Sequence, residues 1–179
     1  MRELPLTRRI VTANDGEGQS YIAEDGPTSS VNVADNIPGF RNNNIWRTLG
    51  CEASIDAPDT IEEQVGVMPP RGGTVIRVVD IPPEPKDPAA LKSAYEARKK
   101  SNLYPDMDLH PSDRHPAMHT TDTVDYAIVL HGEITAVMEK DETVMKAGDI
   151  LIQRGTNHAW ANRSDDFARI AFVLVESAR

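Results

Sequence analysis

The sequence predicts an all-β fold, a sandwich or barrel, into which one short helix is inserted. This prediction depends on the last third of the 179-residue chain, where short apolar runs alternate with turn residues. Turn signals recur there at a spacing of about 8–12 residues, which is typical of antiparallel sandwiches and barrels. The gaps are too short for helical crossovers, so we expect mainly antiparallel pairing. The strands expected in this part are 121–130, 134–138, 143–146, 150–153, 158–162 and 167–175.

The first part of the chain, residues 1–82, adds further strands. Four short runs are separated by turn signals such as Asp15-Gly16 and Pro69-Pro70. We expect these strands to extend the same β structure, so that residues 1–179 form a single domain of ordinary size. The strands expected in this part are 8–12, 19–23, 44–49 and 74–81.

The middle segment, residues 83–118, is rich in proline and charge and predicts one helix over 87–100. Asp87 suits the N-cap and Pro88 the first helical position. Basic residues gather near the C-terminal end of this helix, where the helix dipole favours them. We interpret the segment as an insertion that packs over an opening in the β body, which leaves residues 119–179 as the core of the barrel.

Composition and charge exclude several classes of function. Acidic residues number 28 and basic residues 19, a net charge of −9 that disfavours nucleic acids and anionic membranes as partners. The one cysteine, Cys51, excludes an intrachain disulfide and a Cys-rich zinc site. The sequence has neither an apolar run of about 18 residues nor an apolar N-terminal segment. We therefore expect a cytoplasmic protein that acts on a small molecule or on another protein.

Polar side chains are concentrated on one face of the strand expected around residue 121. Residues at alternate positions of a strand share a face, which places His119, Thr121, Thr123 and Asp125 together. The same face continues as alanine and valine at positions 127 and 129. Polar groups at one end of an apolar face predict the mouth of a pocket or a reactive site.

A second segment carries the same kind of pattern. His158, Trp160 and Asn162 share one face of the strand expected at 158–162. Two imidazoles and one carboxylate can occupy one face of an octahedron around a divalent ion and leave positions open for substrate or oxygen. We therefore predict that His119, Asp125 and His158 hold one divalent metal ion, Fe(II) first, then Zn, Mn or Ni.

These two segments resemble the two motifs of the cupin superfamily. In the first motif, His119 stands at the first histidine, Thr121 at the second, and Asp125 at the glutamate, six residues before Gly132. The chain thus departs from the family pattern of three histidines and a glutamate, and threonine is a poor ligand for these metals. The residues that match the second motif are Gly148, Gly155, His158 and Asn162.

The resemblance implies a cupin jelly-roll, or double-stranded β-helix barrel, with additional N-terminal strands. It implies a small-molecule-binding protein, most simply a metal-dependent enzyme of oxygenase or decarboxylase type that acts on a small organic acid or an aromatic or keto compound. Two alternatives stay open: a metal-free lyase or isomerase with His119 and Asp125 as an acid–base pair, and a ligand-binding cupin without turnover. The resemblance also implies a homodimer that pairs through the outer sheet face and could exchange N-terminal strands.

Several individual residues have two possible roles. Thr121, Thr123, Trp160 and Asn162 are candidates for the substrate pocket, although threonine is also common in strands and tryptophan in cores. Asp125 could instead orient a histidine or pair with Arg77 or Arg169. His115 could replace the missing histidine or lie exposed in a loop. The residues expected to form the apolar walls or the cap of the pocket are Val129, Ile152, Trp160, Tyr95 and Tyr104.

Overall fold

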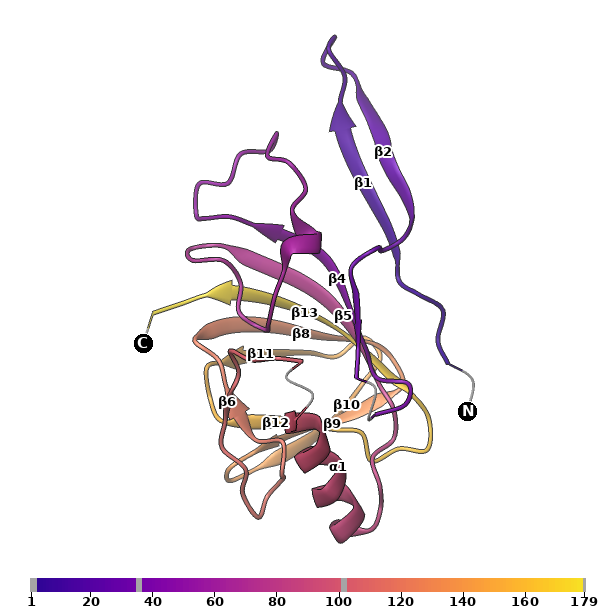
Figure 1. The fold of residues 1–179 in the computed structure, drawn as a ribbon, viewed down its shortest axis with the longest axis vertical. Coiled ribbons are helices and arrows are strands. Elements are labelled where there is room, and N and C mark those ends of the chain that lie inside the picture. Colours follow the sequence, from indigo (N-terminus) through magenta and orange to yellow (C-terminus); the bar gives the residue numbers. More distant parts are fainter. Residues whose placement is uncertain (1–2, 35–36, 101–102, 179) are drawn as a thin grey trace.

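Two β-sheets face each other in the computed structural model, which describes residues 3–34, 37–100 and 103–178 (Figure 1). The six-stranded sheet has the order β11-β8-β13-β5-β4-β3, and its strands are β11 (Ile150–Arg154), β8 (Thr123–His131), β13 (Ala168–Glu176), β5 (Thr74–Ile81), β4 (Arg41–Thr48) and β3 (Val31–Val33). The five-stranded sheet has the order β10-β9-β12-β7-β6, and its strands are β10 (Glu142–Lys146), β9 (Glu133–Met138), β12 (His158–Ala161), β7 (His119–Thr120) and β6 (Asp108–Leu109). The pairings in both sheets are antiparallel, as predicted.

The first two strands form a sheet of their own. β1 (Arg8–Asn14) and β2 (Ser20–Pro27) make a hairpin that projects away from the two sheets (Figure 1). The buried Arg9 anchors the base of this hairpin, because it pairs with Glu24 and Asp59 and donates a hydrogen bond of 2.8 Å to the carbonyl of Ile45. The expectation that every N-terminal strand extends the barrel is therefore wrong for β1 and β2 and right for β4 and β5.

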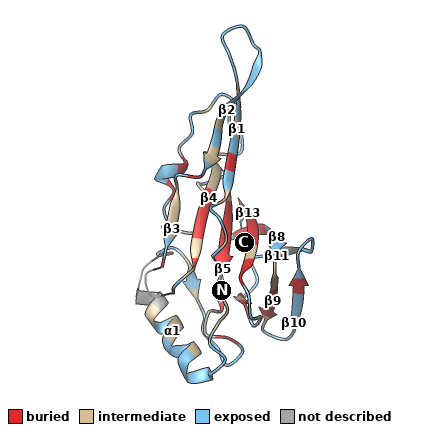
Figure 2. Ribbon diagram, turned by 90° about the vertical axis from the view of Figure 1, so that its right-hand side faces the viewer, coloured by how far each residue is buried: buried red, intermediate tan, exposed pale blue. Residues whose placement is uncertain are grey.

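The helix and most of the strands lie where the sequence predicted them. α1 (Pro88–Lys100) lies outside both sheets (Figure 2), and it is preceded by Asp87, whose Oδ2 accepts a hydrogen bond of 2.7 Å from the backbone of Ala90. No helix in the described part of the chain has the length and apolar character needed to cross a bilayer. The elements that the sequence patterns missed are β3, β6 and the 3-10 turn Ile61–Glu63.

The face that the sequence predicted to run along one strand from His119 to residue 129 belongs to two strands in two different sheets. β7 belongs to the five-stranded sheet and β8 to the six-stranded sheet, so the chain crosses between them at Thr121 and Asp122. The hydroxyl of Thr123 donates a hydrogen bond of 2.8 Å to that of Thr121, while Asp122 is exposed. The alternation of buried and exposed side chains continues through the crossing, which is why the sequence pattern resembled one strand.

Buried residues form a hydrophobic core between the sheets, and Figure 2 marks buried residues on strands of both sheets. The core side chains are almost inaccessible to solvent, among them Val75, Ala127, Val129, Ile134 and Ile170. The opposite, outer face of β8 and β11 carries exposed apolar side chains. Ile152 pairs with Tyr126 on that outer face, so the expectation that Ile152 lines the pocket is wrong. The homodimer expected through this face stays a prediction.

A buried carboxylate joins three strands of the six-stranded sheet. Asp80 of β5 has no solvent exposure and pairs with Arg41 of β4 and with Arg169 of β13. The guanidinium of Arg169 donates hydrogen bonds of 2.6 and 3.0 Å to the two carboxylate oxygens. Arg169 is thus the partner of Asp80 and not of Asp125, which corrects one alternative from the sequence.

Gly132 at the turn after β8 has no room for a side chain. Its φ is +71°, and a Cβ atom there would lie 2.3 Å from the carbonyl oxygen of Phe167. Gly148 also has a positive φ, +99°, but nothing lies within 4 Å of a Cβ atom. We expect Gly148→Ala to cost about 1–2 kcal/mol in free energy of unfolding through backbone strain, and Gly132→Ala about 1–3 kcal/mol more because the backbone must shift. Urea denaturation measures both, and equal losses would contradict the close approach to Phe167.

Candidate functional site

Two histidines face each other across neighbouring strands. His119 of β7 and His158 of β12 are direct partners in the antiparallel register. Directly opposed residues in such a pair point their side chains to the same face of the sheet. The two ring centroids accordingly lie 4.3 Å apart, in a tilted arrangement. Residues 39 positions apart in the sequence thus form one cluster, as the sequence predicted.

Backbone carbonyls fix the position of one proton on each ring. Nδ1 of His119 lies 2.9 Å from the carbonyl oxygen of Ala117, and Nδ1 of His158 lies 2.9 Å from that of Thr156. A carbonyl oxygen only accepts, so each Nδ1 carries a proton, and in the neutral form of each ring Nε2 carries the lone pair. Burial also lowers the pKa of His158 to about 4, against a weaker opposing effect of its hydrogen bond to Thr156. His158 is therefore neutral at physiological pH.

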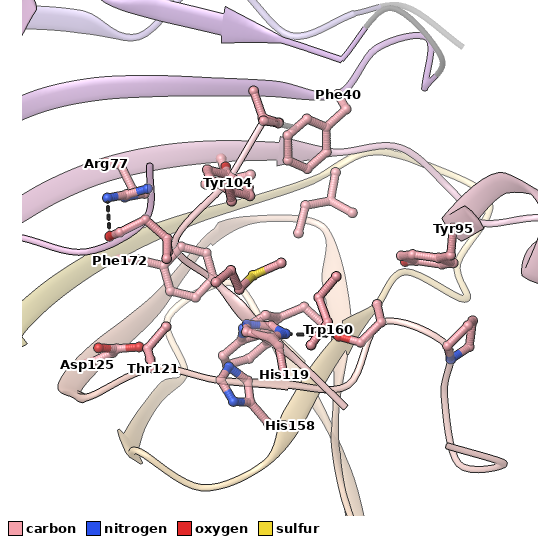
Figure 3. Close-up of a pocket in the computed structure, with 18 of the residues that line it drawn as sticks. Phe40, Arg77, Tyr95, Tyr104, His119, Thr121, Asp125, His158, Trp160 and Phe172 are labelled. Carbon is pink, nitrogen blue, oxygen red and sulfur yellow. Dashed lines mark hydrogen bonds between the residues drawn. The ribbon is translucent and has the colours of Figure 1, made fainter. Parts of the chain in front are cut away.

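A cavity of about 450 Å³ lies between the two sheets and reaches these rings (Figure 3). His119, Thr121, Asp125, His158 and Trp160 all line it, so the structure gathers five of the predicted site residues around one space. Its apolar walls come from both sheets and from the 83–118 insertion. The main apolar and aromatic lining residues are Phe40, Val79, Ile81, Tyr95, Leu103, Tyr104, Met107, Trp160 and Phe172.

Aromatic rings join the two sheets beside the histidines. Trp160 packs edge-on against His158, with ring centroids 5.5 Å apart, and against Phe172 of the opposite sheet at 5.2 Å. Trp160 therefore lines the cavity and also contributes to the core. Tyr95 and Tyr104 line the cavity from the insertion, as expected for a cap, whereas Val129 belongs to the core without lining the cavity.

Two of the residues predicted for the pocket, Thr123 and Asn162, make structural hydrogen bonds and do not line the cavity. Thr123 is buried and donates its hydroxyl hydrogen bond to Thr121, and it does not line the cavity. Asn162 also lies outside the cavity lining. Its Nδ2 donates hydrogen bonds of 2.8 and 2.9 Å to the carbonyls of Ile81 and Asp166, and its Oδ1 accepts from Ser164. Asn162 thus holds the turn between β12 and β13, and its prediction as a pocket residue is corrected.

Asp125 lies on the sheet opposite the histidines. It is a residue of β8 in the six-stranded sheet, where it pairs with Gln153 and Leu174. Burial raises its pKa to about 6, and a polar interaction with the side chain of Thr123 and the charge of Arg77 only partly oppose this rise. One of its carboxylate oxygens, Oδ1, is buried and has no hydrogen-bond partner among the described residues.

The predicted set of three metal ligands is not assembled as one cluster. Within residues 3–34, 37–100 and 103–178, no three His, Cys, Asp or Glu side chains are grouped closely enough to hold one ion. The physical reason is the crossing at Thr121, which places His119 and Asp125 in different sheets. Two imidazoles whose Nδ1 protons are held by backbone carbonyls do suit a divalent first-row ion through Nε2, and water or substrate would fill its other positions.

His115 has neither of the two roles considered for it. It is buried, and its Nε2 lies 3.0 Å from Oε2 of Glu84. Its ring also packs edge-on against Tyr95, with centroids 5.1 Å apart. His115 is therefore neither an exposed loop residue nor a residue lining the cavity, and it connects α1 to the chain that leaves β5.

Arg77 is the functional candidate that the sequence analysis missed. This residue of β5 is buried and lines the cavity, as does the neighbouring inward position Val79. The signal available in the sequence was a single arginine within the apolar run 74–81. The sequence pattern suggested Arg77 only as an ion-pair partner of Asp125, and the two side chains form no ion pair.

Comparison with known proteins agrees with this architecture. The family model described as "Cupin domain" matches residues 105–175. "Phomopsin biosynthesis cluster protein C'" of Diaporthe leptostromiformis is 33% identical over 98% of this chain and 81% of its own length. The chain belongs to the cupin family. Other relatives of this cupin are named cupin-domain-containing oxidoreductases, among them fogC of Aspergillus ruber, 32% identical over 39% of this chain and 36% of its own.

A solved structure is also similar to this cupin. The cupin domain of Schizosaccharomyces pombe Cnp3 matches with a TM-score of 0.46 and 11% identity, over 95% of this chain and 88% of that one.

Proposed function

We propose that this cupin is a metal-dependent oxidoreductase of oxygenase type that acts on a small organic molecule held in the cavity. His119 and His158 would hold one divalent ion, Fe(II) first, then Zn, Mn or Ni. The observation that carries the proposal is the pair of imidazoles, 4.3 Å apart, each with Nδ1 donating to a backbone carbonyl. The relatives named oxidoreductases support the class of reaction.

The residues around the cavity have distinct tasks in this proposal. Trp160 and Phe172 offer apolar surface beside the imidazole rings and keep water from the bound molecule. Tyr95 and Tyr104 narrow the entry from the side of the insertion. Asp125 can hold or release a proton near neutral pH, because its pKa is about 6. When bound, the metal would supply Lewis-acid and electron-transfer chemistry.

Metal content and turnover test the proposal together. We expect protein loaded anaerobically with Fe(II), Zn, Mn or Ni and then desalted to retain about one ion per chain by elemental analysis, since one imidazole pair makes one site. We expect oxygen uptake by the Fe(II) form to depend on added substrate, screened from small aromatic and keto acids, and to stop after treatment with a chelator. Protein that retains no metal, or oxygen-dependent conversion that is indifferent to chelator, would contradict the proposal.

One observation favours a second candidate function, a metal-free lyase or isomerase. A carboxyl with a pKa near 6 lines the same cavity as a neutral imidazole, and such a pair can move a proton at physiological pH. This alternative expects conversion without change of redox state, unaffected by chelator and lost in Asp125→Asn. Binding of the same compounds without any conversion would instead indicate a ligand-binding cupin.

A further inference from the structure

The cavity contains a buried positive charge that forms no ion pair with a carboxylate in the described part of the chain. Arg77 is 2% exposed. Its Nη1 and Nη2 donate hydrogen bonds of 3.3 and 2.6 Å to the backbone carbonyls of Gly66 and Val67. The ring of Tyr104 lies beside the guanidinium, with the centroid 5.9 Å from Cζ. Each of these partners is neutral, and Nε is buried without any acceptor among the described residues.

Other arginines with little solvent exposure have carboxylate partners. Arg9 is paired with Glu24 and Asp59, and both Arg41 and Arg169 are paired with Asp80. A buried charge is costly unless an opposite charge and hydrogen bonds compensate it. Arg77 keeps its proton even where burial disfavours the charge, because a guanidinium is never deprotonated in practice. Because Arg77 lines the cavity, an anion from outside the chain can reach it and supply the missing counter-charge.

The nearby carboxylates of Asp106 and Asp125 do not form an ion pair with Arg77. Asp106 and Asp125 influence Arg77 electrostatically. The carboxylate of Asp106 is instead engaged by the backbone amides of Val67 and Met68, at 2.7 and 2.8 Å. Asp125 leaves Oδ1 without a partner and makes no ion pair with Arg77 among the described residues. Gly66, Val67 and Tyr104 supply neutral hydrogen-bond partners, so Nε, which has no acceptor among the described residues, is left to a ligand.

We propose that Arg77 is a specificity-determining residue that binds the carboxylate of an organic acid in this cavity. Figure 3 shows Arg77 on one side of the cavity, Tyr95 on the other, and the two histidines between them. A guanidinium can grip a carboxylate through two parallel hydrogen bonds. The apolar body of the acid would then lie along Tyr104 and Phe172 and extend toward the histidines. The inference rests on the proposed function, because it names the class of substrate for that site.

Benzoate and its uncharged counterpart benzamide test the proposal on chelator-treated protein, so that no metal ion can bind the carboxylate. We expect ligand-detected NMR titrations to give a Kd at least tenfold lower for benzoate than for benzamide. Arg77→Met, which removes the charge at similar volume, should raise the benzoate Kd at least tenfold, and Arg77→Lys should recover part of the loss. Equal binding of acid and amide to the unmodified protein would overturn the proposal without any variant.

Stability provides a second measurement that separates a binding role from a structural one. We expect Arg77→Met to lower Tm less than Arg169→Met, because only Arg169 leaves a buried carboxylate behind when it is removed. A larger loss for Arg77→Met would indicate a structural role and overturn the proposal. Metal uptake separates this inference from the proposed function, and Arg77→Met should still take up one metal ion per chain. Failure of metal uptake in the unmodified protein would contradict the proposed function alone. Failure of the unmodified protein to bind benzoate would contradict the proposed role of Arg77 alone.

Discussion

His158→Ala is expected to weaken the binding of divalent metal by at least about a hundredfold. Loss of a group that merely orients a metal ligand costs about 10–100-fold in metal affinity, and this variant removes one of the two proposed protein ligands outright. The remaining ring, His119, would hold the ion through a single bond from the protein. Titration of the metal-free protein with Co(II), followed by its absorption spectrum and by calorimetry, measures the change.

His131→Ala is the matched control for this prediction. His131 ends β8 and is exposed, so its removal should leave Co(II) affinity unchanged. His158 is a large buried side chain, and its removal also costs stability by leaving a cavity. Circular dichroism must therefore show that His158→Ala is folded at the temperature of the titration. Equal Co(II) affinity in the folded His158→Ala and His131→Ala proteins would remove the basis for a metal site at the histidine pair.

Asp80→Asn is expected to lower the free energy of unfolding by about 3–5 kcal/mol, the usual cost of breaking a buried ion pair by removing one partner. Asparagine keeps the shape of the side chain, so packing changes little. It leaves the guanidinium groups of Arg41 and Arg169, each 14% exposed, without their shared counter-charge. Because these residues lie on three adjacent strands, the whole six-stranded sheet is affected. Equilibrium denaturation in urea measures the loss.

Asp25→Asn removes an exposed partner and serves as the control. Asp25 and Arg8 form an ion pair of 2.7 Å on the projecting hairpin, with side chains 44% and 67% exposed. Water and salt screen such pairs, so their removal barely changes stability. We expect the urea midpoint of Asp25→Asn to match that of the unmodified protein. A similar midpoint for Asp80→Asn would show that the buried triad does not stabilise the sheet.

The sequence was sufficient for most of the architecture because local patterns determine it. Alternating residues and turn signals located β5 at its observed bounds, and capping residues located α1. The convergence of His119 and His158 followed from the cupin-like motifs. The continuous strand around residue 121 was wrong, because side-chain alternation continues through the crossing and does not reveal a change of sheet. Asp125 was assigned to the histidine cluster for the same reason.

The roles of other residues depended on distant partners that no local pattern reveals. Asn162 looked like a pocket residue by its alternation, but its amide binds carbonyls at positions 81 and 166. His115 gave no sign of burial, which depends on Glu84 and Tyr95. The significance of Arg77 became visible only when its neutral surroundings could be compared with the paired arginines elsewhere.

The 83–118 insertion supplies one wall of the cavity, while the histidines stand on sheet strands of the barrel itself. Residues 103–107 make up much of that wall and belong to neither sheet. Mutations there can accumulate without disturbing the pairing of β7 with β12. Evolution, or a directed-evolution library confined to these positions, could therefore change which compounds the protein binds without altering the histidine pair.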